Sequence, residues 1–271
     1  MKLEFVNPGF SYSLDSMMLF EESNQSDWWR DANFYFYPML KKEELRALPM
    51  SERRAYYQSK LEPFWVEKQT EFAEKLDRWN AHWQKHEGVI AQALSEGFDR
   101  DLSGKLEKIQ GRMALGNVCP RFLEQQAFDV FWMNSERGAM GISMHEITHF
   151  IWFDAWNKHF GDAPAEYEQP NLKWILSEMA VYPFLSDPRL IPLNPYYPKE
   201  KGGCVYPYFY NMKLEGAPVL ETLRRMYREN SLTDFMEAAY AYCRLHVSEI
   251  RAHIAAVESK EISQKIGRTS R

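Results

Sequence analysis

The chain has 271 residues, of which 45% are hydrophobic and 15% are aromatic. This composition excludes an intrinsically disordered protein, and the length predicts one large domain or two lobes with a substantial core. The net charge of −5 excludes a protein whose main ligand is nucleic acid or an acidic membrane surface. No apolar run reaches the roughly eighteen residues of a membrane-spanning helix, so we expect no membrane association.

The N-terminus and the cysteines indicate a compartment. The first residues lack the apolar core and the cleavage site of a signal peptide. Cys119, Cys204 and Cys243 are odd in number and widely spaced, which suits reduced thiols better than a disulfide framework. None belongs to a C-x-x-C pair, so they indicate no zinc site of their own. We therefore expect a cytoplasmic protein.

Residues 1–112 form the first predicted region, which is aromatic and helical. Phe34–Tyr37 is a run of aromatic residues that predicts a short strand, with a flap over a cleft as the alternative. Residues 51–97 are typical of helices: Ser51 begins one, and Pro63 suits the first turn of another. The second helix carries an apolar stripe at three- and four-residue spacing, which is typical of a helix face that packs in the core. The stripe consists of Phe64, Trp65, Phe72, Leu76, Trp79 and Trp83.

His82 and His86 also lie four residues apart on that helix, with Glu87 adjacent. Two histidines at this spacing can hold a metal ion. Lysines nearby and the lack of an obvious third ligand favour a solvated helix face instead.

A strand and a helix are predicted in the second region, residues 113–160. Residues 99–116 are polar and glycine-punctuated, which is typical of a connection between lobes. Phe128–Met133 has the β-favouring composition of a strand. Residues 134–143 contain two glycines and would connect this strand to the next helix.

That helix carries His145-Glu146-Ile147-Thr148-His149, an H-E-x-x-H pattern. Residues four apart lie on one helix face, so the two imidazoles can bind one zinc ion. Glu146 can then take a proton from metal-activated water without binding the metal itself. The alternative is a buried helix that carries two satisfied histidines.

A third ligand is expected, because a catalytic zinc ion has three protein ligands and leaves one position to water. Glu178 is a carboxylate in an otherwise apolar helical segment, Trp174–Tyr182. Burying it unpaired would be costly, and a zinc ion shared with the two histidines would compensate its charge. The alternative places Glu178 on a wet helix face beside Ser177.

The H-E-x-x-H helix is predicted to run to His159 and to stop at Gly161. Asp154 and His159 are candidates for groups that orient a ligand histidine, with an ordinary surface role as the alternative. Farther along, residues 187–203 form a proline-rich loop that is long enough to roof a cleft.

The H-E-I-T-H pattern followed by W-I-L-S-E-M-A-V-Y resembles the gluzincin metallopeptidases, the thermolysin-like group with a glutamate as third zinc ligand. The second block is similar to the W-L-x-E-G-x-A-x-Y pattern of the aminopeptidase-like branch, with Met179 where glycine is usual. It departs from thermolysin at Tyr182, where that enzyme has an aspartate. The resemblance covers roughly residues 127–240.

The resemblance implies an α+β fold that is predominantly helical, a zincin-like two-lobed fold with a small sheet bordering the active-site helix. In such folds an antiparallel edge strand precedes the metal helix, and residues 113–160 would supply both. An extended substrate can pair with such an edge. Residues 161–271 would form a helical C-terminal lobe that contributes the third zinc ligand.

The group that stabilises the oxyanion stays open among three residues. The aminopeptidase-like branch often carries Y-x-x-G-A, but Lys213 stands three residues before Gly216 here. Tyr210 and Tyr208 are the nearest tyrosines. His246 is the remaining candidate, because thermolysin uses a histidine from its C-terminal lobe in this role.

Together these features predict a zinc-dependent metallopeptidase that hydrolyses a peptide or protein substrate by glutamate-assisted attack of metal-activated water. The amine anchor of the aminopeptidases, G-x-M-E-N, is absent, which favours an endopeptidase or a specialised processing enzyme. The alternative is a noncatalytic scaffold ordered by zinc, or a partner-binding protein with a degenerate peptidase site. A metal-free helical protein is the third option.

Overall fold

The computed structural model of the chain describes residues 1–22, 27–102, 104, 106–201 and 203–269. The chain divides into two compact units, each made of two segments. Unit 1 comprises Met1–Glu87 and Ser103–Met140, and unit 2 comprises Gly88–Leu102 and Gly141–Arg271. The fold is predominantly helical with a small mixed sheet, so the coarse α+β prediction is confirmed. Among the described residues, no helix combines the length and the apolar character needed to cross a membrane.

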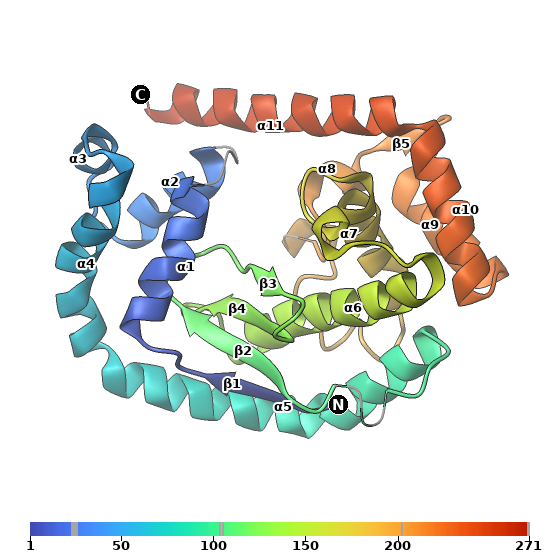
Figure 1. Cartoon of the computed structure of the whole chain (residues 1–271), viewed down its shortest axis with the longest axis horizontal. Coiled ribbons are helices and arrows are strands. Elements are labelled where there is room, and N and C mark those ends of the chain that lie inside the picture. The colour runs from blue at the N-terminus through green and yellow to red at the C-terminus, as the bar shows by residue number, and fades with distance from the viewer. Residues whose placement is uncertain (23–26, 103, 105, 202, 270–271) are drawn as a thin grey trace. The chain divides into compact units, whose positions relative to one another are not determined.

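Unit 1 combines a four-stranded sheet with helices (Figure 1). Its strands are β1 (Leu3–Val6), β2 (Ile109–Ala114), β3 (Arg121–Phe122) and β4 (Ala127–Phe131). Its helices are α1 (Phe10–Glu22), α2 (Asp27–Phe36), α3 (Lys42–Ala47), α4 (Met50–Glu67) and the larger part of α5 (Gln69–Gly97).

The sheet has the order β1-β2-β4-β3. β1, β2 and β4 run parallel, while β3 pairs antiparallel with β4. Every residue of β4 is buried, as expected for an interior strand of a parallel sheet. The prediction of a strand here is confirmed, but the prediction that it is an edge strand is wrong, because β3 covers its other side.

The free side of β1 is closed by side chains of α5. The Asn80 amide accepts a hydrogen bond from the Phe5 N–H at 2.8 Å and donates one to the Phe5 carbonyl at 3.0 Å. Glu87 accepts from the N–H of Leu3 at 3.2 Å. The backbone groups of this edge are therefore occupied, which protects a strand edge from pairing with other chains.

Two predictions of secondary structure in unit 1 need correction. Phe34–Phe36 end helix α2 instead of forming a strand. Tyr37 follows the helix and is buried, and its hydroxyl donates to the Leu115 carbonyl at 2.6 Å and accepts from Trp132 Nε1 at 2.8 Å. An aromatic run favours a strand only weakly, because β-propensity depends on the surrounding packing.

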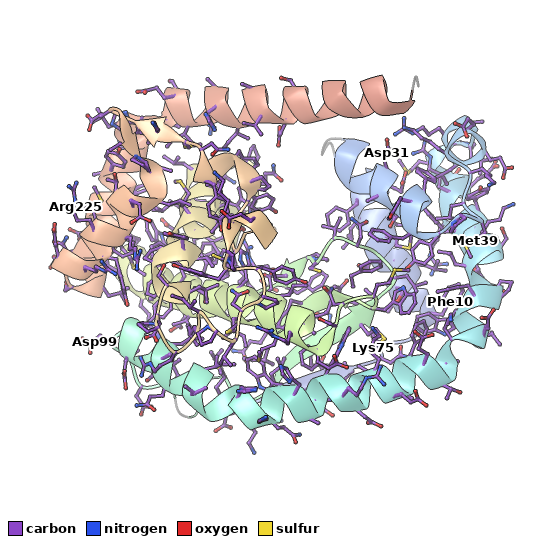
Figure 2. All side chains as sticks on the ribbon, turned by 180° about the vertical axis from the view of Figure 1, so that it is seen from behind. Phe10, Asp31, Met39, Lys75, Asp99 and Arg225 are labelled. Carbon is purple, nitrogen blue, oxygen red and sulfur yellow. The ribbon has the colours of Figure 1, made fainter. Side chains whose placement is uncertain are left out.

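Pro63 does not begin a helix but lies inside α4. It removes one backbone hydrogen bond without ending the helix, and the break between α4 and α5 falls at Lys68. Most of the expected apolar stripe is core: Trp65, Phe72, Trp79 and Trp83 are buried, while Phe64 and Leu76 are half-buried. Phe10, labelled in Figure 2, lies at the start of α1. Its ring packs on Trp65 with ring centroids 5.4 Å apart.

Unit 2 is built from helices and one small two-stranded sheet (Figure 1). Its elements are the end of α5, most of α6 (Glu136–Phe160), the 3-10 helices η1 (Pro164–Tyr167) and η2 (Lys199–Lys201), α7 (Leu172–Leu185), α8 (Pro207–Tyr210), β5 (Lys213–Leu214), β6 (Ala217–Pro218), α9 (Val219–Glu229), α10 (Leu232–Leu245) and α11 (Val247–Thr269).

The core of unit 2 lies around α6 and α7. Helix α7 packs against α9 and α10, and eleven of its 14 residues are buried. Phe184 of α7 stacks on Phe98 with ring centroids 3.8 Å apart, and it also contacts Trp152 of α6. Such aromatic contacts hold α6 and α7 in one fixed packing arrangement.

Helix α6 begins earlier than predicted. Residues 136–143 are helical, where the sequence predicted a connecting loop, and the Gly138 N–H donates to Ser135 Oγ at 3.1 Å at the start of the helix. The predicted end of the helix is confirmed, since it stops at Phe160 and Gly161 adopts a positive φ of 70°.

Candidate metal centre

Helices α6 and α7 bring three potential metal ligands together. His145 and His149 lie one turn apart on α6, and Glu178 comes from α7. His145 Nε2 and His149 Nε2 are 3.0 Å apart. The Glu178 carboxylate places one oxygen 3.3 Å from His145 Nε2 and the other 3.4 Å from His149 Nε2. The sequence predicted that these side chains share one site, and the structure places their ligand atoms within 4.8 Å of one another.

These separations match the geometry of zinc coordination. Zinc–nitrogen and zinc–oxygen bonds of about 2.0–2.1 Å at the tetrahedral angle place neighbouring ligand atoms about 3.3 Å apart. The observed distances of 3.0, 3.3 and 3.4 Å lie around that value, with one carboxylate oxygen of Glu178 facing each histidine. With one ligand atom taken from each residue, the three atoms lie within 4.8 Å of one another, which is close enough for them to share a zinc ion.

Burial of the triad distinguishes this arrangement from a surface cluster. Glu178 is 2% exposed and His149 is 0% exposed, while the His145 side chain is 19% exposed. The alternative that Glu178 lies on a wet face with Ser177 is wrong, because both residues are buried. Solvent reaches the three ligands only on the His145 side.

The second ring nitrogen of His145 is held by the backbone. His145 Nδ1 lies 3.0 Å from the carbonyl oxygen of Cys204. A carbonyl can only accept, so Nδ1 carries the proton and Nε2 presents its lone pair to the triad. The sequence left open which group orients the histidines, and the structure gives His145 a backbone carbonyl as its partner. Tyr182 instead donates its hydroxyl to Glu221 at 2.9 Å.

The electrostatics of the triad favour a cation. Burial acts to lower the pKa of His145, but the hydrogen bond to Glu178 and the charges of Glu146 and Glu178 outweigh it and raise the pKa. Glu146 is itself buried on α6, and its charge acts on the imidazole. A site that stabilises a positive charge on one ligand also attracts a divalent ion.

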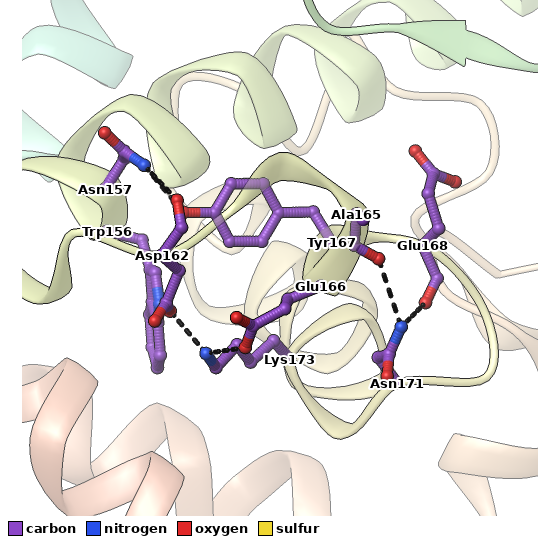
Figure 3. A network of polar contacts seen from close by, with 9 residues as sticks. All are labelled: Trp156, Asn157, Asp162, Ala165, Glu166, Tyr167, Glu168, Asn171 and Lys173. Atoms are coloured by element: carbon purple, nitrogen blue, oxygen red, sulfur yellow. Dashed lines mark hydrogen bonds and ion pairs between the residues drawn. The ribbon is translucent and has the colours of Figure 1, made fainter.

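A polar network holds α7 in the position that presents Glu178. Lys173, in the first turn of α7, forms ion pairs with Asp162 at 2.6 Å and with Glu166 (Figure 3). Asp162 also accepts from Trp156 Nε1 of α6 at 2.6 Å. Burial acts to raise the pKa of Asp162, but the Lys173 ammonium and the Trp156 N–H outweigh it and lower the pKa. The network joins the end of α6 to the start of α7, five residues before Glu178.

The proline-rich loop packs on α6 close to the triad. A Cβ added at Gly141, one turn before His145, would lie 2.8 Å from the Tyr196 ring and 2.9 Å from Asn194 Oδ1. Asn194 is buried, and its Oδ1 accepts from the Tyr196 N–H at 3.0 Å. The glycine at position 141 is thus what allows the loop to approach the helix.

The predicted oxyanion donors have other contacts. His246 places Nδ1 2.9 Å from Glu249 and Nε2 3.5 Å from Glu215. Tyr208 is buried and stacks on Tyr206 with ring centroids 5.2 Å apart.

The hydroxyl of Tyr210 accepts from the Cys204 N–H at 2.7 Å, so it contacts the segment that orients His145. Sequence reasoning missed this use of Cys204 and Tyr210. The glycine pair before Cys204 indicates a turn, but no residue type marks which carbonyl will face a histidine.

Asp154 and His159 lie at the surface end of α6. Asp154 pairs with Lys158 at 2.6 Å and with Arg100 at 3.2 Å, and His159 pairs with Glu237 at 2.6 Å. These contacts agree with the ordinary surface role that was the alternative for both residues.

Comparison of the chain with protein-family models, curated proteins and solved structures finds no match. The chemistry of the triad is therefore the ground on which a function is assigned.

Proposed function

We propose that the protein is a zinc metallopeptidase of the gluzincin type, acting on peptides or proteins, with His145, His149 and Glu178 as zinc ligands. The observation that supports this most strongly is the convergence of two imidazoles and one buried carboxylate, whose ligand atoms lie within 4.8 Å of one another. Among the described residues, this group offers three protein ligands, the number typical of catalytic zinc sites.

Zinc at this site would supply a Lewis acid that acidifies water and polarises a peptide carbonyl. The protein supplies the proton transfers. Glu146 follows the first ligand histidine directly, and its carboxylate would accept the proton of the attacking water. It would then deliver that proton to the nitrogen of the leaving amine, so that the peptide C–N bond breaks as the C–O bond is kept.

The partial exposure of His145 supports a reactive site over a sealed one. A structural zinc ion is normally enclosed by four protein ligands, whereas a catalytic one keeps a position open to water. His145 is the ligand on the solvent side of the triad, so a substrate carbonyl would approach there. The proposed enzyme is an endopeptidase or a specialised processing enzyme, because the amine anchor of the aminopeptidases is absent from the sequence.

Substitution of Glu146 tests the proposal. Wild-type protein should contain one zinc per chain and cleave members of a peptide library, and a chelator should stop the cleavage. Glu146→Gln keeps the shape of the side chain, retains zinc and should lower the cleavage rate by about 10²–10⁴-fold, the contribution of a positioned general base. Glu229→Gln, at an exposed position of α9, is the matched control and should keep full activity.

Three outcomes contradict parts of the proposal. A Glu146→Gln variant with wild-type activity removes Glu146 as the base. Zinc bound stoichiometrically without cleavage of any library member favours a noncatalytic scaffold. Wild-type protein that binds no zinc excludes the metal site itself.

A further inference from the structure

We infer that Tyr210 is a positioning residue for the metal centre: its hydroxyl holds the backbone of Cys204, whose carbonyl fixes His145. The inference rests on the proposed zinc site and assigns Tyr210 a role different from the oxyanion donor that the sequence suggested.

The chain of contacts is short and runs within unit 2. His145 Nδ1 lies 3.0 Å from the Cys204 carbonyl. The N–H of Cys204 donates to the Tyr210 hydroxyl oxygen at 2.7 Å. The backbone of Cys204 is therefore held at its N–H by Tyr210 and at its C=O by His145.

The oxygen of Tyr210 is occupied by this role. It accepts from the backbone, while its own O–H points to the buried Cys204 thiol at 3.6 Å. Burial raises the pKa of Tyr210, so the phenol stays neutral and keeps its proton for this donor contact. A hydroxyl that contacts both the N–H and the thiol of Cys204 serves to hold the turn at this residue.

Gly203 is what allows the phenol so close to the backbone. A Cβ added at Gly203 would lie 2.7 Å from both Cζ and the hydroxyl oxygen of Tyr210. Gly203 also has a positive φ of 80°, which residues with a Cβ rarely adopt. Any side chain at this position would push Tyr210 away from the turn.

The ring of Tyr210 meets the helix of the third ligand. It packs edge-on against Tyr182 with ring centroids 6.3 Å apart. Tyr182 is four residues after Glu178 on α7, and residues at this spacing share a helix face. One side chain thus contacts both the turn that orients His145 and the helix that carries Glu178.

The expected effect follows from the geometry of a ligand histidine. Its second ring nitrogen fixes both the tautomer and the direction of the metal-binding lone pair, and loss of such a partner typically costs 10–100-fold in metal affinity. Tyr210→Phe keeps the ring but removes the hydroxyl that holds the Cys204 backbone. We therefore expect zinc to bind about tenfold more weakly.

The matched control is Tyr227→Phe. Tyr227 is also a partly buried tyrosine of unit 2, and it donates to the Gly97 carbonyl at 2.8 Å, away from the triad. Both variants lose one hydroxyl hydrogen bond to the backbone, so a general loss of stability affects both. Only Tyr210→Phe should weaken zinc binding, measured by competition with a chromophoric chelator, and alter the visible spectrum of the cobalt-substituted protein.

A second measurement needs no metal. In metal-free wild-type protein, the His145 Nδ1 proton should give a nuclear magnetic resonance signal protected from solvent exchange, and Tyr210→Phe should lose that protection. Wild-type protein that binds no zinc but shows this difference overturns the proposed function and supports the positioning role. The inference is overturned if Tyr210→Phe has the same zinc affinity and the same His145 proton exchange as Tyr227→Phe. It is also overturned if the His145 Nδ1 proton of the wild-type protein is not protected from exchange.

Discussion

Replacement of Glu178 by glutamine is the sharpest test of the metal centre. The change swaps one carboxylate oxygen for an amide nitrogen and leaves the volume of this 2%-exposed side chain unaltered. In the metal-free protein it removes a buried charge together with its contacts to the two imidazoles, so the stability of the variant without zinc is measured first and serves as its reference. The loss of a zinc ligand then appears as a smaller stabilisation by zinc.

The magnitude follows from the preformed geometry of the site. Because the three ligand atoms come together only in the folded chain, zinc that binds there adds its binding free energy to the stability of the fold. At free zinc 1,000-fold above the wild-type dissociation constant, the expected stabilisation is about 4 kcal/mol. Loss of a group that only orients a ligand histidine costs up to about 100-fold in metal affinity. Loss of Glu178, which would bind the metal directly, should therefore weaken zinc binding by at least that factor. At the same zinc concentration the stabilisation would then fall to about 1.4 kcal/mol or less.

Urea unfolding gives the measurement. Tryptophan fluorescence follows the transition, since Trp152 on α6 and Trp174 on α7 are buried in the unit that holds the triad. Each protein is unfolded with a chelator and at one fixed free zinc concentration, and the difference between the two free energies isolates the metal. Glu229→Gln, exposed on α9, should behave like wild type. A zinc-induced stabilisation that is equal in Glu178→Gln and wild type would refute the assignment of this ligand.

Two further predictions concern the scaffold. Burial raises the pKa of Asp129 from 3.8 to about 6, so the native protein holds this proton more tightly than the unfolded chain and loses stability as pH rises from about 4 to 6. Asp129→Asn should therefore raise the free energy of unfolding in urea by up to about 3 kcal/mol over wild type at pH 7 and by little at pH 4. An equal increase at both pH values would contradict this reasoning. Gly141→Ala places a methyl group 2.8 Å from the Tyr196 ring and should lower the free energy of unfolding by about 1–3 kcal/mol. Gly88→Ala meets open space on α5 and should raise it by up to about 1 kcal/mol. Thermal unfolding that ranks the two variants the other way would contradict the packing of Tyr196 on α6.

The sequence alone predicted the local part of the candidate site. The four-residue spacing of His145 and His149 places both on one helix face whatever surrounds the helix, because helix geometry is fixed by the backbone. The apolar neighbours of Glu178 predicted a buried carboxylate in need of a positive partner, and the structure buries it beside the two imidazoles. Gly161 predicted the end of α6 for the same local reason, since glycine readily adopts positive φ.

Tertiary structure decided what depends on partners far apart in the chain. The aromatic run at residues 34–37 was predicted to be a strand, but in the folded chain Phe34–Phe36 end α2 and Tyr37 bonds to Leu115 and Trp132, which are far away in the sequence. β4 became an interior strand because β3 folds back onto it, and strand pairing is not encoded in one segment. Every residue has a carbonyl, so only the folded chain could select that of Cys204 for His145 and bring the Tyr210 hydroxyl to hold it.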